Sequence, residues 1–150
     1  MLVKKKVGHE GSLKKLLGRS KGFMNEKLIV ASRDGNFNIV SELLNKGAYV
    51  NAKNTYGETP LIKASEKGHK ALVDLLLTRG ASAGTLDFYS RTPLHYAAAA
   101  GQREVVELLL TRYPGNLNAP DYFDKTPLYY AASNGHVDVV ELLRRHGGCE

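Results

Sequence analysis

A serine flanked by glycines is the first feature of this sequence that could do chemistry. Residues 80–84 read Gly-Ala-Ser-Ala-Gly, which matches the Gly-x-Ser-x-Gly pattern of a nucleophile elbow, where a tight strand-to-helix turn exposes the serine. Here the segment follows an apolar helical stretch and aligns with residues 47–51, which carry no serine. We therefore interpret Ser82 as part of a structural turn and expect no hydrolase activity.

Histidines and carboxylates are the other candidates for metal binding or acid–base chemistry. His69 and His136 occupy equivalent positions two copies of a repeat apart, so stacked helices would hold them about 20 Å from each other, too far to share a metal ion. His95 follows an expected helix start and should bond loop carbonyls. Asp121 and Asp124 are expected in a solvated loop without a buried partner. The sequence thus predicts no metal, no cofactor, no small-molecule substrate and no enzyme.

The single cysteine, Cys149, excludes an intrachain disulfide framework and a thiolate zinc site. No apolar run approaches the roughly 18 residues that a membrane-spanning helix requires. The single cysteine favours an intracellular, reducing location. The cytoplasm is our first expectation and the nucleus the second.

The net charge of +6 is concentrated at the N-terminus. Residues 1–22 hold seven lysines and arginines and one glutamate, whereas residues 23–150 hold fourteen basic and fourteen acidic groups. This basic extension has three interpretations: a solvated or docking segment, weak contact with an anionic surface such as a membrane or nucleic acid, or a targeting signal at Lys4–Lys6.

The elements that must position all these residues recur with a fixed period. The triplet Thr-Pro-Leu starts at residues 59, 92 and 126, which gives spacings of 33 and 34 residues. Two small residues keep the same spacing over four copies: Ala31, Ala64, Ala97 and Ala131, and Gly35, Gly68, Gly101 and Gly135. A period of this length predicts a stack of repeated supersecondary units.

Each copy reads as two helices followed by a polar loop. Threonine is a good N-cap, proline is pre-organised for the first helical position, and the glycine after the first helix ends it in the left-handed conformation. The second helix has an apolar stripe too wide for one neighbour, so adjacent copies must also cover it. Leu76 and Leu109 are expected in the interior.

These motifs resemble the ankyrin repeat family from Phe23 to the C-terminus. The closest stretches are residues 47–52 (Gly-Ala-Tyr-Val-Asn-Ala), 92–98 (Thr-Pro-Leu-His-Tyr-Ala-Ala) and 134–136 (Asn-Gly-His). Copies two and four lack the histidine at the position of His95, and residues 82–84 depart from the Val-Asn part of the pattern. The resemblance implies an all-α solenoid of helix-turn-helix units with projecting β-hairpin-like loops.

We divide the chain into the basic N-terminal extension, 1–22, and four repeats at about 23–53, 54–86, 87–120 and 121–150. A terminal repeat needs a polar outer face. Glu42 in the first copy and Arg144 in the fourth stand where the other copies have leucine. Copies one and four are therefore interpreted as caps, and we expect a monomer.

The resemblance implies a noncatalytic module that binds a protein partner, which the sequence does not identify. The alternative is that the basic N-terminal extension tethers the chain to an anionic surface, with the repeats as a secondary scaffold. In this family recognition falls on the loop tips and on the exposed, concave side of the first helices. The matching residues are Lys53, Thr55, Tyr56, Glu58, Glu66, Lys67, Leu86, Phe88, Tyr89, Arg91, Tyr122, Phe123, Lys125, Ser133 and Asn134.

Large rings recur at the tips of three successive loops, where turns usually carry Gly, Asn, Asp or Ser. Stacked about 10 Å apart, they would form an aromatic stripe edged by Arg91 and Lys125, two residues of the types found in binding surfaces. The alternative is that the rings pack on one another and only stiffen the loops.

Overall fold

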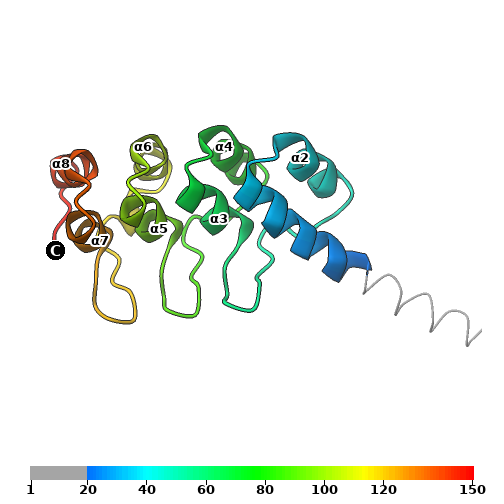
Figure 1. Ribbon diagram of the computed structural model, residues 1–150, viewed down its shortest axis with the longest axis horizontal. Helices are drawn as coiled ribbons and strands as arrows, with labels where there is room; N and C mark the ends of the chain where they lie inside the picture. The colour runs from blue at the N-terminus through cyan, green and yellow to red at the C-terminus, as the bar shows by residue number, and fades with distance from the viewer. Residues whose placement is uncertain (1–19) are drawn as a thin grey trace, which may run out of the picture.

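The computed structural model describes residues 20–150, and this part of the chain is a stack of four helix pairs (Figure 1). The first pair consists of a helix over residues 20–34 and α2 (Phe37–Asn45). The next pairs are α3 (Pro60–Lys67) with α4 (Lys70–Thr78), α5 (Pro93–Ala99) with α6 (Arg103–Arg112), and α7 (Pro127–Ser133) with α8 (Val137–Arg145). A short 3-10 turn, η1 (Pro114–Asn116), follows α6.

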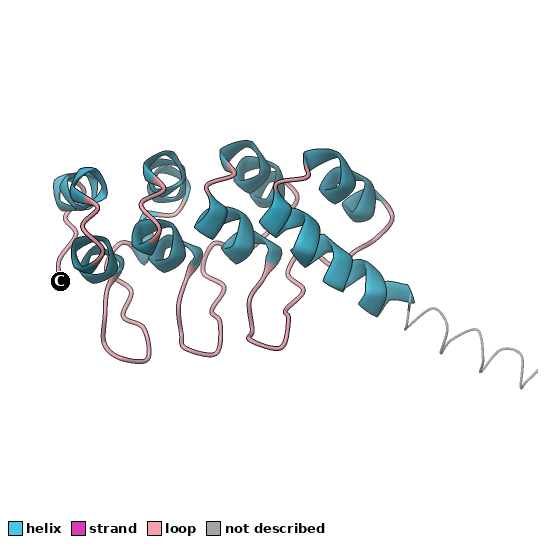
Figure 2. Cartoon of the chain, in the orientation of Figure 1, coloured by secondary structure: helices cyan, strands magenta, loops and turns pink. Residues whose placement is uncertain are grey.

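The helices form two layers. The inner layer contains the helix over residues 20–34 with α3, α5 and α7, and the outer layer contains α2, α4, α6 and α8 (Figure 1). Three loops project from the inner layer, away from the outer helices, and no strand occurs within residues 20–150 (Figure 2). The predicted all-α repeat solenoid is confirmed.

The inner helices begin and end as their sequence predicts. Thr59, Thr92 and Thr126 accept a hydrogen bond from the backbone N–H three residues on, and a proline occupies the first turn of each helix. Gly68 ends α3 with a φ of +77°, a conformation that glycine adopts without a steric penalty.

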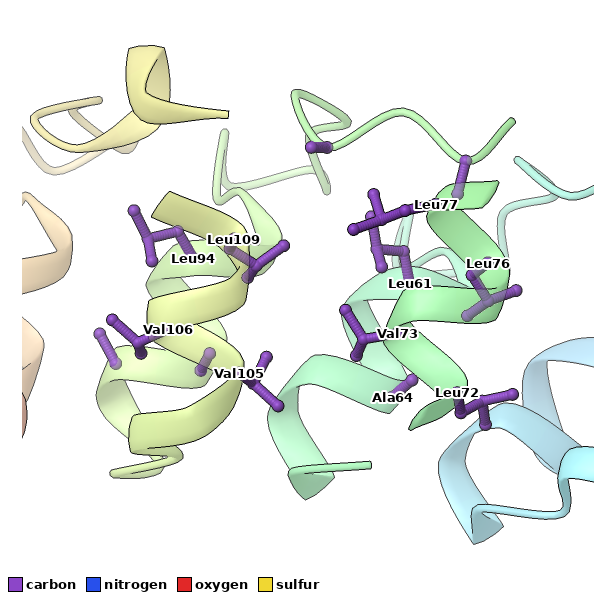
Figure 3. Close-up of a cluster of buried hydrophobic side chains, with 14 of the residues drawn as sticks. Leu61, Ala64, Leu72, Val73, Leu76, Leu77, Leu94, Val105, Val106 and Leu109 are labelled. Atoms are coloured by element: carbon purple, nitrogen blue, oxygen red, sulfur yellow. The ribbon is translucent and has the colours of Figure 1, made fainter. Parts of the chain in front are cut away.

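The core lies between the two layers and runs through every copy. Leu61 and Leu94 from the inner layer and Val73 and Val106 from the outer layer are at most 1% exposed (Figure 3). Leu109 is 3% exposed and its equivalent Leu76 is fully buried, which confirms the predicted interior positions. Each copy therefore buries its apolar faces largely on its neighbours, as expected for a solenoid.

Polar residues lie exposed where the sequence placed the caps. Glu42 of α2 and Arg144 of α8 are both exposed, whereas Leu77 and Leu110, which are equivalent to Arg144, are buried. Lys46 pairs with Glu42 at 2.8 Å on the surface.

The predicted boundary between residues 22 and 23 lies inside a helix. The helix is continuous from residue 20 to residue 34 and is longer than the other inner helices, which contain seven or eight residues. Residues 1–19, which hold most of the basic extension, lie outside the described residues.

The third copy is one residue longer than the second, and it compensates for the altered loop of the second. Asn51 and Asn118 each accept a hydrogen bond from a backbone N–H of the next copy, at 2.9 Å, but their equivalent in copy two is Gly84. Asn116, within η1, instead donates its side-chain N–H to the carbonyl of Ala83 at 2.7 Å. The joint between copies two and three thus keeps a side-chain hydrogen bond.

Candidate functional site

One polar side chain at the base of each loop holds that loop in shape. In each case its Oδ1 accepts hydrogen bonds of 2.9 Å from the backbone N–H groups two and four residues on; the three residues are Asn54, Asp87 and Asp121. These Asx turns add to a backbone hydrogen bond that closes each loop, from the N–H of the same residue to the carbonyl four residues on. The loop tips are therefore held in one conformation.

Neighbouring loops are also bonded to each other through their backbones. The N–H of Phe88 donates to the carbonyl of Tyr56 at 3.3 Å, and the N–H of Tyr122 donates to the carbonyl of Tyr89 at 2.8 Å. The three tips consequently form one continuous edge along the stack.

Five aromatic side chains project from this edge, and we call them the tip rings: Tyr56, Phe88, Tyr89, Tyr122 and Phe123. Their exposed fractions are 67%, 68%, 50%, 73% and 52%, in that order. Large apolar side chains exposed together in neighbouring elements are typical of interaction sites.

The tip rings also contact one another. Tyr89 and Phe123 are stacked with centroids 6.2 Å apart, closer than the spacing of about 10 Å that helix stacking suggests. Tyr122 packs edge-to-face on Phe123 at 5.4 Å, and the ring of Phe88 fills the space where Gly57 would carry a Cβ. The rings thus stiffen the loops while half or more of each side chain stays exposed.

Arg91 lies between two rings and a carboxylate. Its Cζ is 5.2 Å from the ring centroid of Tyr89 and 5.3 Å from that of Tyr130, and its Nε donates to Asp121 Oδ2 at 3.4 Å. The guanidinium therefore holds the third and fourth copies together, in addition to edging the tip rings.

The two lysines at the loop edges are similarly placed. Lys125 Nζ lies 4.3 Å from the ring centroid of Tyr129, and Lys53 Nζ donates to the carbonyl of Leu86 at 2.8 Å. Both residues hold their loops against the adjacent copy or helix.

The prediction that Asp121 is solvated is wrong. Its side chain is buried and accepts hydrogen bonds from the Tyr130 hydroxyl, Arg91 and the N–H groups of Phe123 and Lys125, whereas Asp124 is exposed. Burial alone would raise the pKa of Asp121, but these hydrogen bonds outweigh it and lower the pKa from its ordinary value. The carboxylate is a structural acceptor.

The equivalent charges of the second copy are compensated inside that copy. Lys63 Nζ lies 3.3 Å from Glu58 and 3.2 Å from Glu66, and the lysine and glutamate side chains are only 14–27% exposed. The inner face therefore changes along the stack. It carries paired charges in copy two and tyrosines, Tyr96 and Tyr130, at the position of Lys63 in copies three and four.

An open cleft of about 680 Å³ lies between the long first helix and the first loop. Glu26, Ile29, Val30 and Arg33 line it from the helix, and Lys63 and the loop around Tyr56 line it from the other side. The loop residues were predicted to lie in a contact surface, but the helix residues were not. One sequence signal points to these helix residues: the first copy lacks Thr-Pro. Because that start signal is missing, the first helix can begin earlier than its equivalents.

A comparison with known protein families matches the chain to the family described as ankyrin repeats (3 copies), over residues 1–87, 28–121 and 73–150. The chain belongs to the ankyrin repeat family. The family description contains three repeats, and its three matches overlap along the chain. More than three repeats are therefore present, in agreement with the four helix pairs of the structure. A search of curated proteins found no match.

Ankyrin repeats are in general protein–protein interaction modules, and the remaining residues singled out for that role lie on the expected faces. Thr55 and Leu86 are exposed on the loops, and Lys67 and Ser133 are exposed at the ends of α3 and α7. Asn134 is also exposed and donates to the carbonyl of Ala99 at 2.7 Å.

The remaining polar candidates have structural partners within the ankyrin stack. The backbone N–H of Ser82 donates to Asn51 Oδ1, and the residue lies in a turn after α4, as predicted. His95 is 1% exposed; its Nδ1 accepts from the N–H of Thr92 at 3.1 Å and its Nε2 donates to the carbonyl of Lys125 at 3.0 Å. The predicted carbonyl bond is confirmed.

Within residues 20–150, no three His, Cys, Asp or Glu side chains gather as a metal site would require. None of the helices described there has the length and apolar character needed to cross a membrane.

Proposed function

We propose that this ankyrin repeat protein is a noncatalytic binding module that contacts a protein partner through the tip rings and the inner layer. The observation that carries the proposal is the continuous edge formed by three loops, on which five aromatic side chains remain half or more exposed. Aromatic anchors on a fixed backbone are typical of the residues that dominate binding energy.

The cleft beside the first helix extends this surface. It joins Tyr56 and Glu58 of the first loop to Val30, which is 45% exposed, so both apolar and charged groups line it. We propose that the partner covers both the tip rings and this cleft, that the chain acts as a monomer, and that it is intracellular.

The experiment compares a double variant with a matched control. Phe88→Ala with Tyr122→Ala should abolish partner capture from native extract, because two exposed rings are removed from the contact surface. The control pair, Phe37→Ala with Tyr113→Ala, removes rings that are 44% and 40% exposed outside the tips and should retain capture. Loss of capture in both pairs, or retention in both, would contradict the proposed surface.

Stability must be measured on the same samples. The tip rings contact one another, so their removal is expected to lower the free energy of unfolding modestly, by about 0.5–1.5 kcal/mol for each lost ring pair. If the double variant unfolds at a much lower temperature while its folded fraction still binds, the rings are structural and the partner surface lies elsewhere.

A second role, contact with an anionic surface, is favoured by one observation: the whole net charge lies in residues 1–22. We propose that such binding depends on the lysines of this segment. Because a helix crosses residue 22, the test keeps the full chain and changes Lys4, Lys5, Lys6, Lys14 and Lys15 to glutamine. Equal binding of the variant to anionic vesicles or DNA at low salt would contradict this role.

A further inference from the structure

We propose that an extended segment of a protein partner binds between the first helix and the first loop. Its backbone is hydrogen-bonded to the edge of that loop, one apolar side chain lies against Val30 and Tyr56, and one basic side chain lies beside Glu26. This inference rests on the proposed function and specifies the chemistry of the partner. It follows from two backbone groups without a partner and from the shape and lining of the groove next to them.

Neighbouring loops are bonded in one direction along the stack. The N–H groups of Phe88 and Tyr122, which occupy equivalent positions, each donate to a carbonyl of the preceding loop. The carbonyl of Leu86 accepts from Lys53 Nζ of the preceding copy at 2.8 Å. The second loop therefore presents both a donor and an acceptor to the loop before it.

The first loop has the same two groups, but no loop lies before it within residues 20–150 (Figure 2). Thr55 is equivalent to Phe88, and Lys53 is equivalent to Leu86. In this part of the chain, neither the N–H of Thr55 nor the carbonyl of Lys53 has a hydrogen-bond partner. Unpaired backbone groups at an edge are a template for another chain, and peptides that add to such an edge gain main-chain hydrogen bonds.

A groove of suitable length runs along this edge. It consists of the cleft of about 680 Å³ described above and of a second open cleft of about 580 Å³, which Gly22 and Tyr49 help to line. Glu26 and Lys53 line both clefts, so the two adjoin. From Gly22 to Arg33 the helix extends about 16 Å, which is the length of about five extended residues.

The larger cleft offers apolar surface to one side chain of the bound segment. Val30 lines it from the helix and Tyr56 from the loop, and both are exposed. The corresponding space between copies three and four, lined by Tyr96, Ala99 and Tyr130, is only about 60 Å³. The room for an apolar side chain is therefore specific to the first joint of the stack.

Glu26 is the charged group of the groove that is left for a ligand. Arg33 is paired with its neighbour in the helix, and Lys63 is paired with two glutamates of the second copy. Lys53 Nζ is bonded to the carbonyl of Leu86 in the next copy, which takes it away from the unpaired edge. Since Glu26 lines both clefts, a lysine or arginine of the segment can pair with it, whereas a phosphate group would be repelled.

The first test uses the full-length chain and peptides selected on it from a displayed library of random sequences. Thr55→Pro removes the N–H, and proline fits this position of the turn that Asn54 and Gly57 close. The affinity of the selected peptides should fall about fivefold or more in Thr55→Pro and stay within about twofold in Thr55→Ala, which keeps the N–H. Equal affinities for the two variants overturn the proposal.

A second test leaves the chain unchanged, so it does not depend on how a variant folds. Each backbone N–H of a selected peptide is replaced in turn by an ester oxygen. One replacement should weaken binding about fivefold or more, because that N–H donates to the carbonyl of Lys53. If no replacement weakens binding, the backbone contact is absent and the proposal is overturned.

The charge is tested with two glutamate variants. Glu26→Gln should weaken peptides that contain lysine or arginine about twofold to fivefold at low salt, and less at high salt. Glu107→Gln changes an exposed glutamate outside the groove and should leave binding unchanged. Equal binding by these two variants at low salt would overturn the assignment of the basic side chain to Glu26.

Amide hydrogen exchange separates the other possible occupants of the edge. In the free full-length chain the N–H of Thr55 should exchange rapidly and that of Tyr122, which is bonded to the preceding loop, slowly. A saturating selected peptide should slow the exchange of Thr55. Slow exchange without peptide overturns the proposal: it would mean that residues 1–19 cover the edge, or a second copy if the slowing depends on protein concentration.

Partner capture distinguishes this inference from the proposed function. Capture from native extract should be weakened by Thr55→Pro as well as by Phe88→Ala with Tyr122→Ala. Loss in the tip variant alone overturns this inference and leaves the proposed function in place. Capture retained by both variants contradicts both.

Discussion

The side-chain amide of Gln102 lies over Gly68 of the preceding copy, and its Oε1 leaves no room for a Cβ on that glycine. Its Nε2 donates to the carbonyl of Glu66 at 3.0 Å. Two other joints repeat this contact, with His69 over Gly35 and His136 over Gly101. The recurring glycine thus serves helix termination and, at these three joints, also close packing between copies.

The same sequence position has another use in the first copy. Asn36 accepts a hydrogen bond from the N–H of Ile39 and caps its own helix, whereas His69, Gln102 and His136 make no such side-chain cap. The three later residues point to a preceding copy, and their Nε2 atoms bond its carbonyls. This difference makes His69 and His136 joint residues, because their Nε2 atoms are engaged by carbonyls of a preceding copy.

A pair of glycine substitutions separates packing from backbone strain. Gly101 and Gly135 have φ values of +72° and +77°, but only Gly101 is covered, by the ring of His136. Gly135→Ala should cost about 1–2 kcal/mol from the left-handed backbone alone. Gly101→Ala should cost about 1–3 kcal/mol more, because His136 must also move. Urea unfolding of the two variants checks the difference, and equal losses would show that the joint adapts freely.

Stability should decrease as the pH falls below about 6.5, with a contribution from His95. Burial lowers the pKa of His95 from its ordinary value of 6.5. The unfolded chain therefore binds the proton more readily, and the native state loses stability below the unfolded pKa. His95→Ile, which copies Ile62 of the second repeat, should reduce the change in melting temperature between pH 7 and pH 5.5. His69→Gln, which copies Gln102, is the control and should leave most of that change in place.

Two adjacent leucines of α6 should differ in their contribution to stability. Leu109 is 3% exposed in the core between the layers, so Leu109→Ala should cost about 2–5 kcal/mol. Leu108 is only partly buried, and Leu108→Ala should cost about 1 kcal/mol. Chemical denaturation followed by circular dichroism measures both. A loss below about 0.5 kcal/mol for Leu109→Ala would mean that this position is not part of the core.

Ser90→Gly should stabilise the second projecting loop. Ser90 has a φ of +59°, where the equivalent residue of the first loop is Gly57. Glycine adopts this conformation without the steric cost that a side chain adds, so we expect a gain of about 0.5–1 kcal/mol. A rise in melting temperature without a change in the tip rings' near-ultraviolet circular dichroism would support this. A decrease would show that the serine side chain contributes to the loop.

Local sequence signals are sufficient to predict the helix pairs, their period and their core. Thr59 and Pro60 start a helix, Gly68 ends it, and Leu61 faces the interior, because these signals act between residues close in the chain and recur at 33 or 34 residues. The family resemblance and the turn at Ser82 depend on the same local pattern, so the structure confirms them.

The roles of the polar and aromatic loop residues depend on contacts between copies, which local sequence signals do not specify. Asp121 reads as a solvated loop acid because its partners are distant: Arg91 lies 30 residues before it. The position of Arg91 between Tyr89 and Tyr130, and the cleft beside the long first helix, likewise depend on which copies become neighbours. Side-chain burial and pairing across copies are set by stacking, and the local pattern that specifies each helix carries no record of them.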